Sequence, residues 1–507
     1  MTTLQDALAR LWAADDDAKM LEFQGTWFTW GHVRALSEDI ERQLVSVGCA
    51  AGARVAVVLR NSVESVAALI AIIRGGRTLV TLSPLQPPDR LSADLLATGV
   101  DFVLAPAASF EQGSFTAAIE ELEATAFSVE GQIVELRARG HGHSNPGDPE
   151  VQIEMLTSGT TGPAKRIPLT RRQLEASLGA AQQHSNRPDG SERAPLTGRV
   201  GLITLPIVHI GGLWSLLQAL TSARPMVMLE RFSLPEWHRI VKEHHPKLAG
   251  LPPPAIRTVL DSDIPREDLA SIAAINAGTS PVEPALVDEF LQRYGIPILI
   301  VYGATEFAGA VAGWTLKDFR RCWSEKRGSV GRAFPGVSLR IVDDGGAPQP
   351  PGQTGRLQVA SVQVSGGTGD WVTTSDLAHL DEDGFLYIDG RADDVIIRGG
   401  FKVSPETVVK ALRAHDAVAD AAVAGLPDPR LGHVPVAAVE LRPNAEADPE
   451  DLRTHCRAVL TPYEVPTQVF VVEELPRGAA LKVDRRRLIE MLEAQRNAGG
   501  LDVNAAR

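Results

Sequence analysis

Short apolar runs alternate with helical patterns along most of the chain, and this alternation limits the fold more than any other feature. The run "RVAVVL" (54–59) has the composition of a buried strand, and the helical pattern "SVESVAALIAIIRG" follows it. Similar runs recur as "VQIEML" (151–156), "GLITL" (201–205), "PMVML" (225–229) and "IPILIVYG" (296–303). Strands that alternate with helices and Gly/Pro turns predict α/β architecture.

The pattern changes near residue 328, where short runs separated by many glycines begin. "GVSLRIVDDGGAPQPPGQTGRLQVA" predicts a twisted sheet or small barrel with tight turns. The charged, glycine-rich segment "RADDVIIRGGFKV" (391–403) precedes a further alternation of strands and helices. A chain of 507 residues is too long for one ordinary core. We therefore predict two domains, residues 1–392 and 393–507, with the boundary at Asp393.

Two sites carry the spacing of a helix start. Thr170 stands three residues before Gln173, and Ser280 stands three residues before Glu283 with Pro281 between them. A Ser or Thr followed three residues later by Gln or Glu is typical of a capping box, and Pro suits the first turn. We predict that helices begin after Thr170 and after Ser280.

Composition and charge exclude several classes of partner. The formal net charge is −13, which disfavours nucleic acid and anionic membranes as partners. The N-terminus is acidic where a signal peptide needs a positive start, and the longest apolar stretch is far shorter than a membrane span. Cys49, Cys322 and Cys456 are isolated, which favours a reducing compartment. We expect a cytoplasmic protein, and the sequence carries no signal for an oligomeric state.

The segment "LTSGTTGPAKRIPLT" (156–170) has the composition of a phosphate cradle. Backbone N–H groups of a Gly/Ser/Thr loop bind phosphate oxygens, and a lysine adds positive charge. The P-loop of nucleotide kinases is excluded, because Lys165 lies three residues after Gly162 and precedes Arg166 instead of Ser or Thr. On these residues alone, a phosphate cradle and a surface turn both stay open.

Four further motifs decide between these readings. They are "LPIVHIGG" (205–212), "YGATE" (302–306), "TSDLAHLDEDGFLYIDGRADDVIIRGG" (374–400) and "PRGAALKVDRR" (476–486). With the glycine-rich loop, and in this order over essentially the whole chain, they resemble the adenylate-forming superfamily that includes acyl-CoA synthetases and firefly luciferase. The resemblance implies an α/β fold with a large N-terminal domain of stacked sheets, a small β-barrel-like subdomain and a small mobile C-terminal α+β domain.

The resemblance also implies a reaction and a nucleotide site. Members activate a carboxylate with ATP to an acyl-adenylate and then transfer the acyl group to a thiol. The triphosphate would be held by Thr157, Ser158, Gly159, Thr160, Thr161, Gly162 and Lys165.

Further positions of this implied site surround the adenosine and the α-phosphate. Tyr302 would stack on adenine, with Gly278 and Thr279 lining its other side. Thr305 would touch the α-phosphate. Glu306 would hold Mg²⁺, which offsets the repulsion between a carboxylate and a polyphosphate.

Two positions in the second half of the implied site match those that grip the ribose. These positions are Asp376 and Arg391. A carboxylate such as that of Asp376 is the natural acceptor for the hydrogen bonds of a diol. An alternative for Asp376 is a plain turn residue.

The acyl group would lie beside His209, which matches a family position near the carboxylate and the thiol tunnel. Gly-Gly after it permits close approach of a ligand. The expected pocket lining is Gly211, Gly212, Leu213, Trp214, Ala304, Phe307, Ala308, Gly309 and Val311. This set is apolar and has no charge partner for an ammonium, so it favours a bulky hydrophobic carboxylic acid over an amino acid. Ordinary core positions are the alternative.

The C-terminal domain of the family swivels between the two chemical steps, and Asp393 matches its hinge. One orientation would bring Lys482 to the substrate carboxylate and α-phosphate for adenylation. The other would bring Arg398, Gly399 and Gly400 beside the pantetheine of coenzyme A.

This sequence departs from the family in two loops. The usual Pro-Lys-Gly is Ala164, Lys165 and Arg166 here, and the usual Gly before the catalytic lysine is Leu481. If position 481 needs a positive φ, a leucine there costs on the order of 1 kcal/mol or more. Both departures concern the ATP-dependent step. We therefore hypothesise an acyl-CoA ligase weakened in adenylation that still converts acyl-adenylate to acyl-CoA, with a separate adenylating enzyme as partner.

Three alternatives stay open at this point. One is a complete two-step synthetase, with Arg166 adding a phosphate contact. Another is an adenylating enzyme that loads a carrier-protein thiol, and the third is a non-catalytic protein that binds acyl-adenylate.

Overall fold

The computed structural model describes residues 3–130, 134–137, 147–156, 165–185, 194–364, 370–398, 401–478 and 481–504. These residues fold as two compact units. The first comprises the described residues up to Ser338 and those within 360–370, and the second comprises Leu339–Val359 and the described residues from Trp371 onward. The domain boundary predicted at Asp393 is a different division and stays a prediction.

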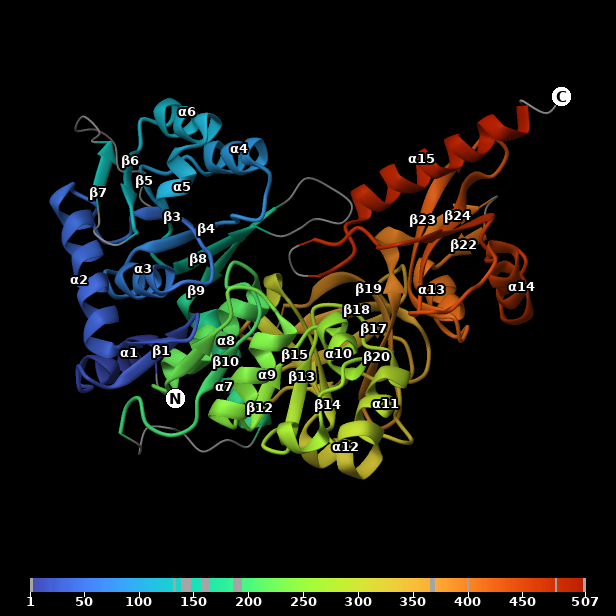
Figure 1. Ribbon diagram of the computed structural model, residues 1–507, viewed down its shortest axis with the longest axis horizontal. Coiled ribbons are helices and arrows are strands. Elements are labelled where there is room, and N and C mark those ends of the chain that lie inside the picture. Colours follow the sequence, from blue (N-terminus) through green and yellow to red (C-terminus); the bar gives the residue numbers. More distant parts are fainter. Residues whose placement is uncertain are drawn as a thin grey trace. The chain divides into compact units, whose positions relative to one another are not determined.

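A seven-stranded sheet dominates the first part of the first unit (Figure 1). Its strand order is β7-β6-β5-β3-β4-β8-β9. The strands are β3 (Arg54–Val58), β4 (Thr78–Leu82), β5 (Phe102–Ala105), β6 (Thr125–Ser128), β7 (Val134–Arg137), β8 (Val151–Leu156) and β9 (Arg166–Thr170). The central strands are parallel, while β7 and β9 pair antiparallel at the two edges.

Helices cover both faces of this sheet, because successive residues of a strand point to opposite sides. Val55 and Val57 join the core formed with α2 (Trp30–Ser46) and α3 (Val63–Arg74). Ala56 and Val58 join a second core with α4 (Pro88–Thr98) and α6 (Gly113–Glu121). Continuous apolar composition of β3 follows from burial on both faces.

Two more sheets complete the first unit. One has the order β10-β11-β1-β2, and the other runs through β12, β13, β14, β15 and β16 as successive neighbours. Their strands are β1 (Lys19–Phe23), β2 (Thr26–Thr29), β10 (Gly201–Ile203), β11 (Met226–Met228), β12 (Leu248–Gly250), β13 (Ala274–Ala277), β14 (Ile298–Ala304), β15 (Gly309–Gly313) and β16 (Gly331–Ala333). The remaining helices of the first unit are α1 (Leu4–Trp12), α5 (Ala107–Phe110), α7 (Arg171–His184), α8 (Ile210–Thr221), α9 (Leu234–His244), α10 (Pro253–Leu260), η2 (Arg266–Leu269), α11 (Pro284–Tyr294), η3 (Thr305–Phe307) and α12 (Leu316–Cys322).

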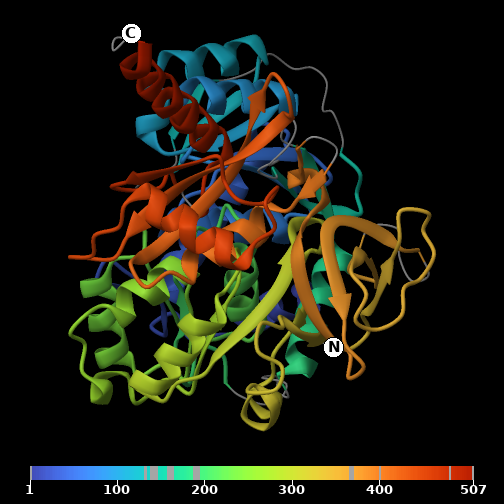
Figure 2. The same cartoon turned by 90° about the vertical axis from the view of Figure 1, so that its right-hand side faces the viewer.

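The second unit begins with strands in the order β20-β19-β18-β17, in which β19 pairs antiparallel with both β18 and β20. It continues with a second sheet in the order β22-β21-β24-β23, where β25 also pairs with β24. Figure 2 faces this part of the chain. The elements are β17 (Ser338–Val342), β18 (Gly355–Ala360), β19 (Val372–Leu380), β20 (Phe385–Arg391), η4 (Ala392–Asp394), β21 (Ile396–Arg398), β22 (Phe401–Val403), α13 (Pro405–Arg413), β23 (Val418–Asp428), β24 (Gly432–Leu441), α14 (Pro449–Val459), β25 (Gln468–Val472) and α15 (Arg485–Asn504).

The long hairpin β23–β24 has a helical layer on each side. Leu488 and Leu492 of α15 pack on one face, against residues such as Ala424 and Val436. Helices α13 and α14 pack on the other face. The predicted alternation of strands and helices after Asp393 is therefore present, and the predicted α/β class is confirmed.

The two predicted helix starts have different outcomes. Thr170 caps α7 through a capping box with Gln173, as predicted. The prediction after Ser280 is wrong, because α11 begins at Pro284 with Glu283 as its N-cap. Across the described ranges, no helix combines the length and apolar character needed to span a bilayer.

Candidate functional site

The glycine-rich loop joins two paired strands. Leu156 at the end of β8 lies opposite Arg166 at the start of β9, so the two ends of the loop are held at strand spacing. Lys165 is exposed at this junction. Of the other predicted phosphate ligands and Ala164, all of which fall in 157–164, none lies within the described residues.

Arg166, one of the two departures from the family pattern, is built into the first unit. Its Nη1 donates to the carbonyl oxygen of Thr81 at 3.0 Å, and its Nη2 donates to Oδ1 of Asp94 at 2.5 Å. The side chains of Arg166 and Asp94 are 16% and 7% exposed. Burial raises the pKa of Asp94, and the charge of Arg166 only partly offsets this. The guanidinium is thus engaged with α4 and β4.

His209 is the N-cap residue of α8, and the turn before it is held rigidly. The His209 amide donates to the Pro206 carbonyl at 3.0 Å, and the His209 carbonyl accepts from Leu213 at 2.9 Å. A Cβ at Gly212 would lie 2.2 Å from the Pro206 oxygen. Since no side chain tolerates that distance, the turn requires glycine at this position.

Asn61 fixes the same turn from a distant part of the sequence. This buried amide donates through Nδ2 to the carbonyls of Leu205 (3.1 Å) and Leu229 (2.7 Å), and its Oδ1 accepts from the amide of Ile207 (2.8 Å). Both donors and the acceptor are therefore used. Asn61 was not predicted from the sequence, where its only local signal is a polar residue two positions after the apolar run 54–59.

The predicted adenine site gathers at the carboxyl ends of two parallel strands. Gly278 follows β13, and a Cβ there would lie 2.9 Å from the carbonyl oxygen of Val301 on β14, next to Tyr302. Thr279 has a positive φ of 71°, and its side chain lies against the position that a Cβ of Gly211 would take. The structure thus brings Gly278, Thr279 and Tyr302 together with the start of α8. Carboxyl ends of parallel strands are the usual ligand edge of α/β sheets.

Glu306 lies in the short helix η3 with Thr305 and is exposed. Mg²⁺ in enzymes of phosphate chemistry commonly binds one or two carboxylates together with substrate phosphates. An exposed single carboxylate beside the predicted nucleotide site fits that ligand requirement.

The predicted acyl pocket has a strained turn as one wall. Ala308 has a φ of 52° and Gly309 a φ of 140°. A Cβ on Gly309 would lie 2.6 Å from Oγ of Ser177 and 2.8 Å from Cδ1 of Trp214. The Trp214 indole donates to that same hydroxyl at 3.2 Å. Trp214 therefore packs directly on the glycine backbone.

The other predicted lining positions divide between core and edge. Leu213 and Ala308 are part of the main core cluster, while Phe307 and Val311 are also buried and Ala304 is half-buried. Gln363, which was not predicted from the sequence, is fully buried beside this wall. Its Nε2 donates to the carbonyls of Phe307 (3.1 Å) and Ala310 (2.9 Å), so one amide holds both sides of the strained turn.

The second unit brings together Asp376, Arg391 and Lys482. Asp376 on β19 lies opposite Arg391 on β20, and Arg391 Nε is 4.0 Å from Asp376 Oδ1. Arg391 Nη2 also donates to Oγ of Ser375 at 2.5 Å. Lys482 keeps contact with solvent, yet the surrounding protein and the positive charge of Arg391 lower its pKa, partly offset by Asp376. The predicted ribose ligands and the predicted catalytic lysine are neighbours.

Lys482 lies in a tight turn that we call the lysine loop, residues 476–484, of which 479 and 480 are outside the described residues. The amide of Gly478 donates to the Lys482 carbonyl at 2.7 Å, and the amide of Leu481 donates to the Gly478 carbonyl at 2.9 Å. Leu481 has a φ of 59°, in the left-handed region. That conformation suits glycine, the residue usual at this position, and strains leucine.

The predicted hinge region is the short helix η4, in which the side chain of Asp393 is not among those described. Its neighbour Asp394 forms an ion pair with Arg485, three residues after Lys482. Arg398 donates to the carbonyls of Tyr463 (2.7 Å) and Val465 (3.0 Å). Gly399 and Gly400 lie outside the described residues.

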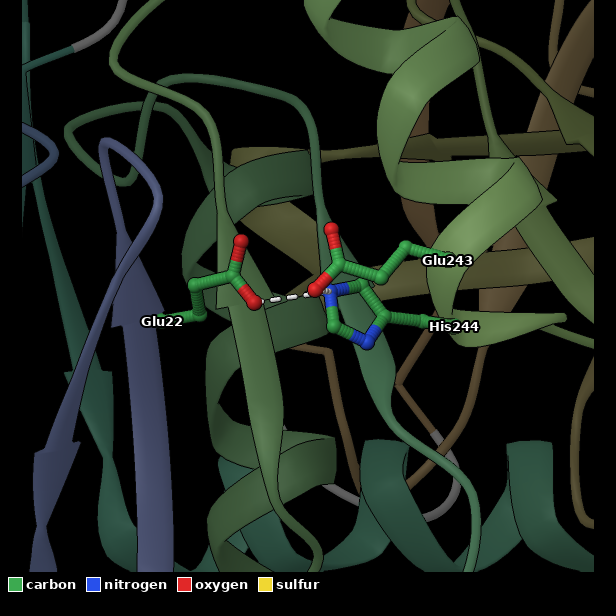
Figure 3. A group of neighbouring side chains, drawn as sticks. All are labelled: Glu22, Glu243 and His244. Carbon is green, nitrogen blue, oxygen red and sulfur yellow. Dashed lines mark ion pairs between the residues drawn. The ribbon is translucent and has the colours of Figure 1, made fainter.

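Among the described residues, one group of possible metal ligands stands apart from the predicted site. Figure 3 shows Glu22 of β1 with Glu243 and His244 of α9. His244 Nε2 is 2.7 Å from Glu22 Oε2, and Arg239 Nη2 is 2.7 Å from Glu22 Oε1. The arginine already neutralises the buried carboxylate, so the group is explained as an ion-pair network joining α9 to β1.

Comparison with known families decides the class of this chain. The AMP-binding enzyme model matches residues 8–367, and the AMP-binding enzyme C-terminal domain model matches residues 409–482. The chain belongs to the AMP-binding enzyme family. Its superfamily, predicted from the five motifs, is confirmed, and the ligase is an acid–thiol ligase of the acyl-CoA synthetase type.

Two relatives of this ligase are named as CoA ligases. 4-Coumarate–CoA ligase 5 of Oryza sativa subsp. japonica is 28% identical over 500 residues, covering 93% of this chain and 90% of that protein. The long-chain-fatty-acid–CoA ligase of Bacillus subtilis (strain 168) is 31% identical over 363 residues, covering 68% of this chain and 62% of that protein.

Solved structures agree with the fold of this ligase. The o-succinylbenzoate CoA synthetase of Bacillus subtilis, in complex with its acyl-adenylate intermediate, matches with a TM-score of 0.79 and 25% identity over 95% of this chain and 97% of that chain. ATP-bound MatB from Rhodopseudomonas palustris matches with a TM-score of 0.81 and 23% identity over 96% and 99% of the chains. The predicted two-part α/β architecture is the one these enzymes share.

Proposed function

We propose that this ligase forms the CoA thioester of a hydrophobic carboxylic acid and that adenylation is the slower of its two steps. In the first step a carboxylate oxygen attacks the α-phosphorus of ATP, and pyrophosphate leaves. In the second step the sulfur of coenzyme A attacks the acyl carbonyl carbon, AMP leaves and the thiol proton is released. The relatives named as CoA ligases support the overall reaction.

The charged residues of the second unit suit the first step. Lys482 carries the positive charge that would draw the carboxylate and the α-phosphate together, and Asp376 and Arg391 beside it would hold the ribose. Glu306 would hold Mg²⁺, which neutralises phosphate charge when bound. A related o-succinylbenzoate CoA synthetase is known in complex with ATP and magnesium ion, which supports this assignment.

The apolar residues around Trp214 in the predicted acyl pocket support a hydrophobic acid as the substrate. Trp214, Gly309 and the buried Phe307 are apolar, and the hydroxyl of Ser177 is already bonded to the indole. A charged tail on the substrate would need a buried partner of opposite charge, and the predicted lining supplies none.

The left-handed backbone of Leu481 is the observation that carries the slow first step. A non-glycine residue in this conformation costs about 1–2 kcal/mol. If the loop must hold this conformation to present Lys482, the competent population falls by roughly 5- to 30-fold. The second step does not use Lys482, so the same strain leaves it unaffected. A separate adenylating enzyme would then be a natural partner that supplies acyl-adenylate.

One observation favours the second candidate, a complete synthetase with balanced steps. The lysine loop is closed by internal hydrogen bonds and by the side chain of Arg477, and these contacts offset part of the strain.

The two half-reactions can be measured separately. Exchange of labelled pyrophosphate into ATP, over a panel of aromatic and aliphatic acids, reports adenylation. Thioester formation from the corresponding synthetic acyl-adenylate and CoA reports the second step. We expect the first rate to be lower, and Leu481→Gly to raise it about tenfold while the second changes less than about twofold. Exchange as fast as thioester formation, and unchanged by Leu481→Gly, would overturn the proposal.

A further inference from the structure

Arg477 connects the lysine loop to the sheet of the second unit. Its Nη1 donates to the carbonyl oxygen of Leu481 at 3.3 Å. Its Nη2 forms ion pairs with Asp420 on β23 and with Glu440 on β24, the latter at 3.3 Å. The main chain of Arg477 also forms an isolated antiparallel bridge with Val483. One side chain therefore spans from the strained residue before Lys482 to two strands.

The two carboxylates that receive Arg477 form an unusual pair. Asp420 and Glu440 lie directly opposite each other in the register of β23 and β24, and their side chains are only 18% and 16% exposed. Like charges placed opposite on neighbouring strands repel each other, more strongly when water is excluded. A cation between them removes this repulsion, so the two acids form a socket for a guanidinium.

Asp420 alone does not need Arg477. Arg413 already donates to Oδ1 of Asp420 through Nε at 2.8 Å and through Nη2 at 2.6 Å. Glu440 differs, because its Oε1 accepts the backbone amide of Leu475 and its other oxygen faces Arg477. The socket therefore holds two parts of the chain. Glu440 binds the backbone of Leu475, just before the lysine loop, and both acids bind the guanidinium of Arg477, which reaches Leu481 on the far side of the loop.

The far side of the loop is the part that needs support. Leu481 holds a left-handed φ of 59° in spite of its Cβ, and such conformations persist where surrounding contacts over-determine them. The contact from Arg477 acts on the carbonyl of this residue, which is the peptide group that leads directly into Lys482.

We propose that Arg477 is a positioning residue for Lys482, acting through the carbonyl of Leu481 and anchored by Asp420 and Glu440. The inference rests on the proposed function of Lys482 in adenylation. It predicts that loss of the guanidinium impairs the first half-reaction and spares the second, since thioester formation does not need Lys482 in place. An arginine that only stabilised the fold would affect both halves alike.

The test uses the full chain with Arg477→Met and Arg477→Lys. Arg453→Met is the matched control, because Arg453 on α14 likewise joins a carboxylate, Glu450 at 2.6 Å, to a backbone carbonyl, Pro466 at 3.0 Å, but outside the lysine loop. Each variant is made in the natural and in the Leu481→Gly background, so that exchange is measured even where the natural rate is low. Hydrogen exchange of peptides covering 475–484 provides a readout independent of activity.

We expect Arg477→Met to lower pyrophosphate exchange about tenfold or more, with thioester formation from acyl-adenylate within about twofold of the parent. Amide exchange in the lysine loop should rise about tenfold in Arg477→Met and stay unchanged in Arg453→Met. Arg477→Lys should recover only part of the rate, since a lysine cannot reach all three partners at once.

Equal losses in both half-reactions, matched by Arg453→Met, would show that Arg477 only stabilises the fold and would overturn the inference. Unchanged loop exchange in Arg477→Met would overturn it as well. These outcomes are distinct from those that would refute the proposal that adenylation is the slower step. That proposal is tested by the parent enzyme and by Leu481→Gly alone.

Discussion

Arg166 and Asp94 form a largely buried ion pair that joins the first residue of β9 to helix α4, across 72 positions of sequence. The same guanidinium binds the Thr81 carbonyl at the end of β4. The arginine that replaces the family's glycine therefore fastens the exit of the glycine-rich loop to the central sheet.

The first prediction concerns this pair. Asp94→Asn leaves a buried guanidinium without its carboxylate and should lower the free energy of unfolding by about 3 kcal/mol. The double variant Asp94→Leu with Arg166→Met should lose much less, because burial already makes the ionised Asp94 costly. Urea unfolding of Asp94→Leu, Arg166→Met and their double variant measures the coupling. An additive double variant would contradict the pairing, and a raised KM for ATP in Arg166→Met alone would point to phosphate contact instead.

The second prediction concerns Asn61 and the turn before His209. Asn61→Ala removes three hydrogen bonds and leaves buried carbonyls without donors, so we expect a loss of about 3 kcal/mol in stability. At temperatures where the variant is still folded, the rate of thioester formation should fall about tenfold or more, because the turn no longer fixes the position of His209. Tyr294→Phe, which removes a buried hydroxyl bonded to Val259 and Ile264, is the control and should leave the rate unchanged. A native rate in folded Asn61→Ala would refute this role.

The third prediction concerns the wall of the proposed acyl pocket. Trp214→Ala removes the indole that packs on Gly309 and should shift the preferred acid toward larger or longer chains, with KM for those acids falling about tenfold. Gly309→Ala should act in the opposite sense, because its Cβ would press on Trp214 and Ser177. Steady-state kinetics over a graded series of acids measures both. An unchanged order of preference in both variants would place the acyl chain elsewhere.

The fourth prediction concerns pH. Although burial acts to raise it, the charges of Arg413 and Arg477 hold the pKa of Asp420 below its usual value. A depressed folded-state pKa contributes stability that is fully present above the unfolded pKa of about 3.8 and is lost as pH falls through the folded-state pKa. Asp420→Asn should therefore flatten the acid limb of stability below pH 4. Urea unfolding at a series of pH values, read by pulsed hydrogen exchange in β23 and β24, measures this pH dependence of stability. An unaltered acid limb would be evidence against the ion pairs of Asp420 with Arg413 and Arg477.

Much of the candidate site could be predicted from the sequence because its residues are grouped in short motifs, and the roles given to those residues stay predictions. The strain expected at Leu481 depended on a single condition, a positive φ at that residue, and its φ is positive. Tyr302 lies near the end of β14, and Thr305 and Glu306 follow that strand in η3, so their common location could be read from a single stretch of sequence.

The missed residues act across long separations in sequence. Asn61 meets Leu205 from 144 positions away, and Gln363 meets Phe307 from 56 positions away. Such contacts depend on how strands are ordered in a sheet, which local patterns do not specify. The misplaced start of α11 has a local cause, since Pro281 and Pro284 both suit a first helical turn and spacing alone does not choose between them.

The backbone at Leu481 has a consequence for how such an enzyme adapts. The residue has no predicted contact with ATP, acid or coenzyme A, yet exchange between leucine and glycine there would change how often the lysine is ready. Under the proposed function, a lineage would retune the rate at which the reactive mixed anhydride forms through one codon, leaving every ligand-binding side chain, and hence substrate choice, as inherited.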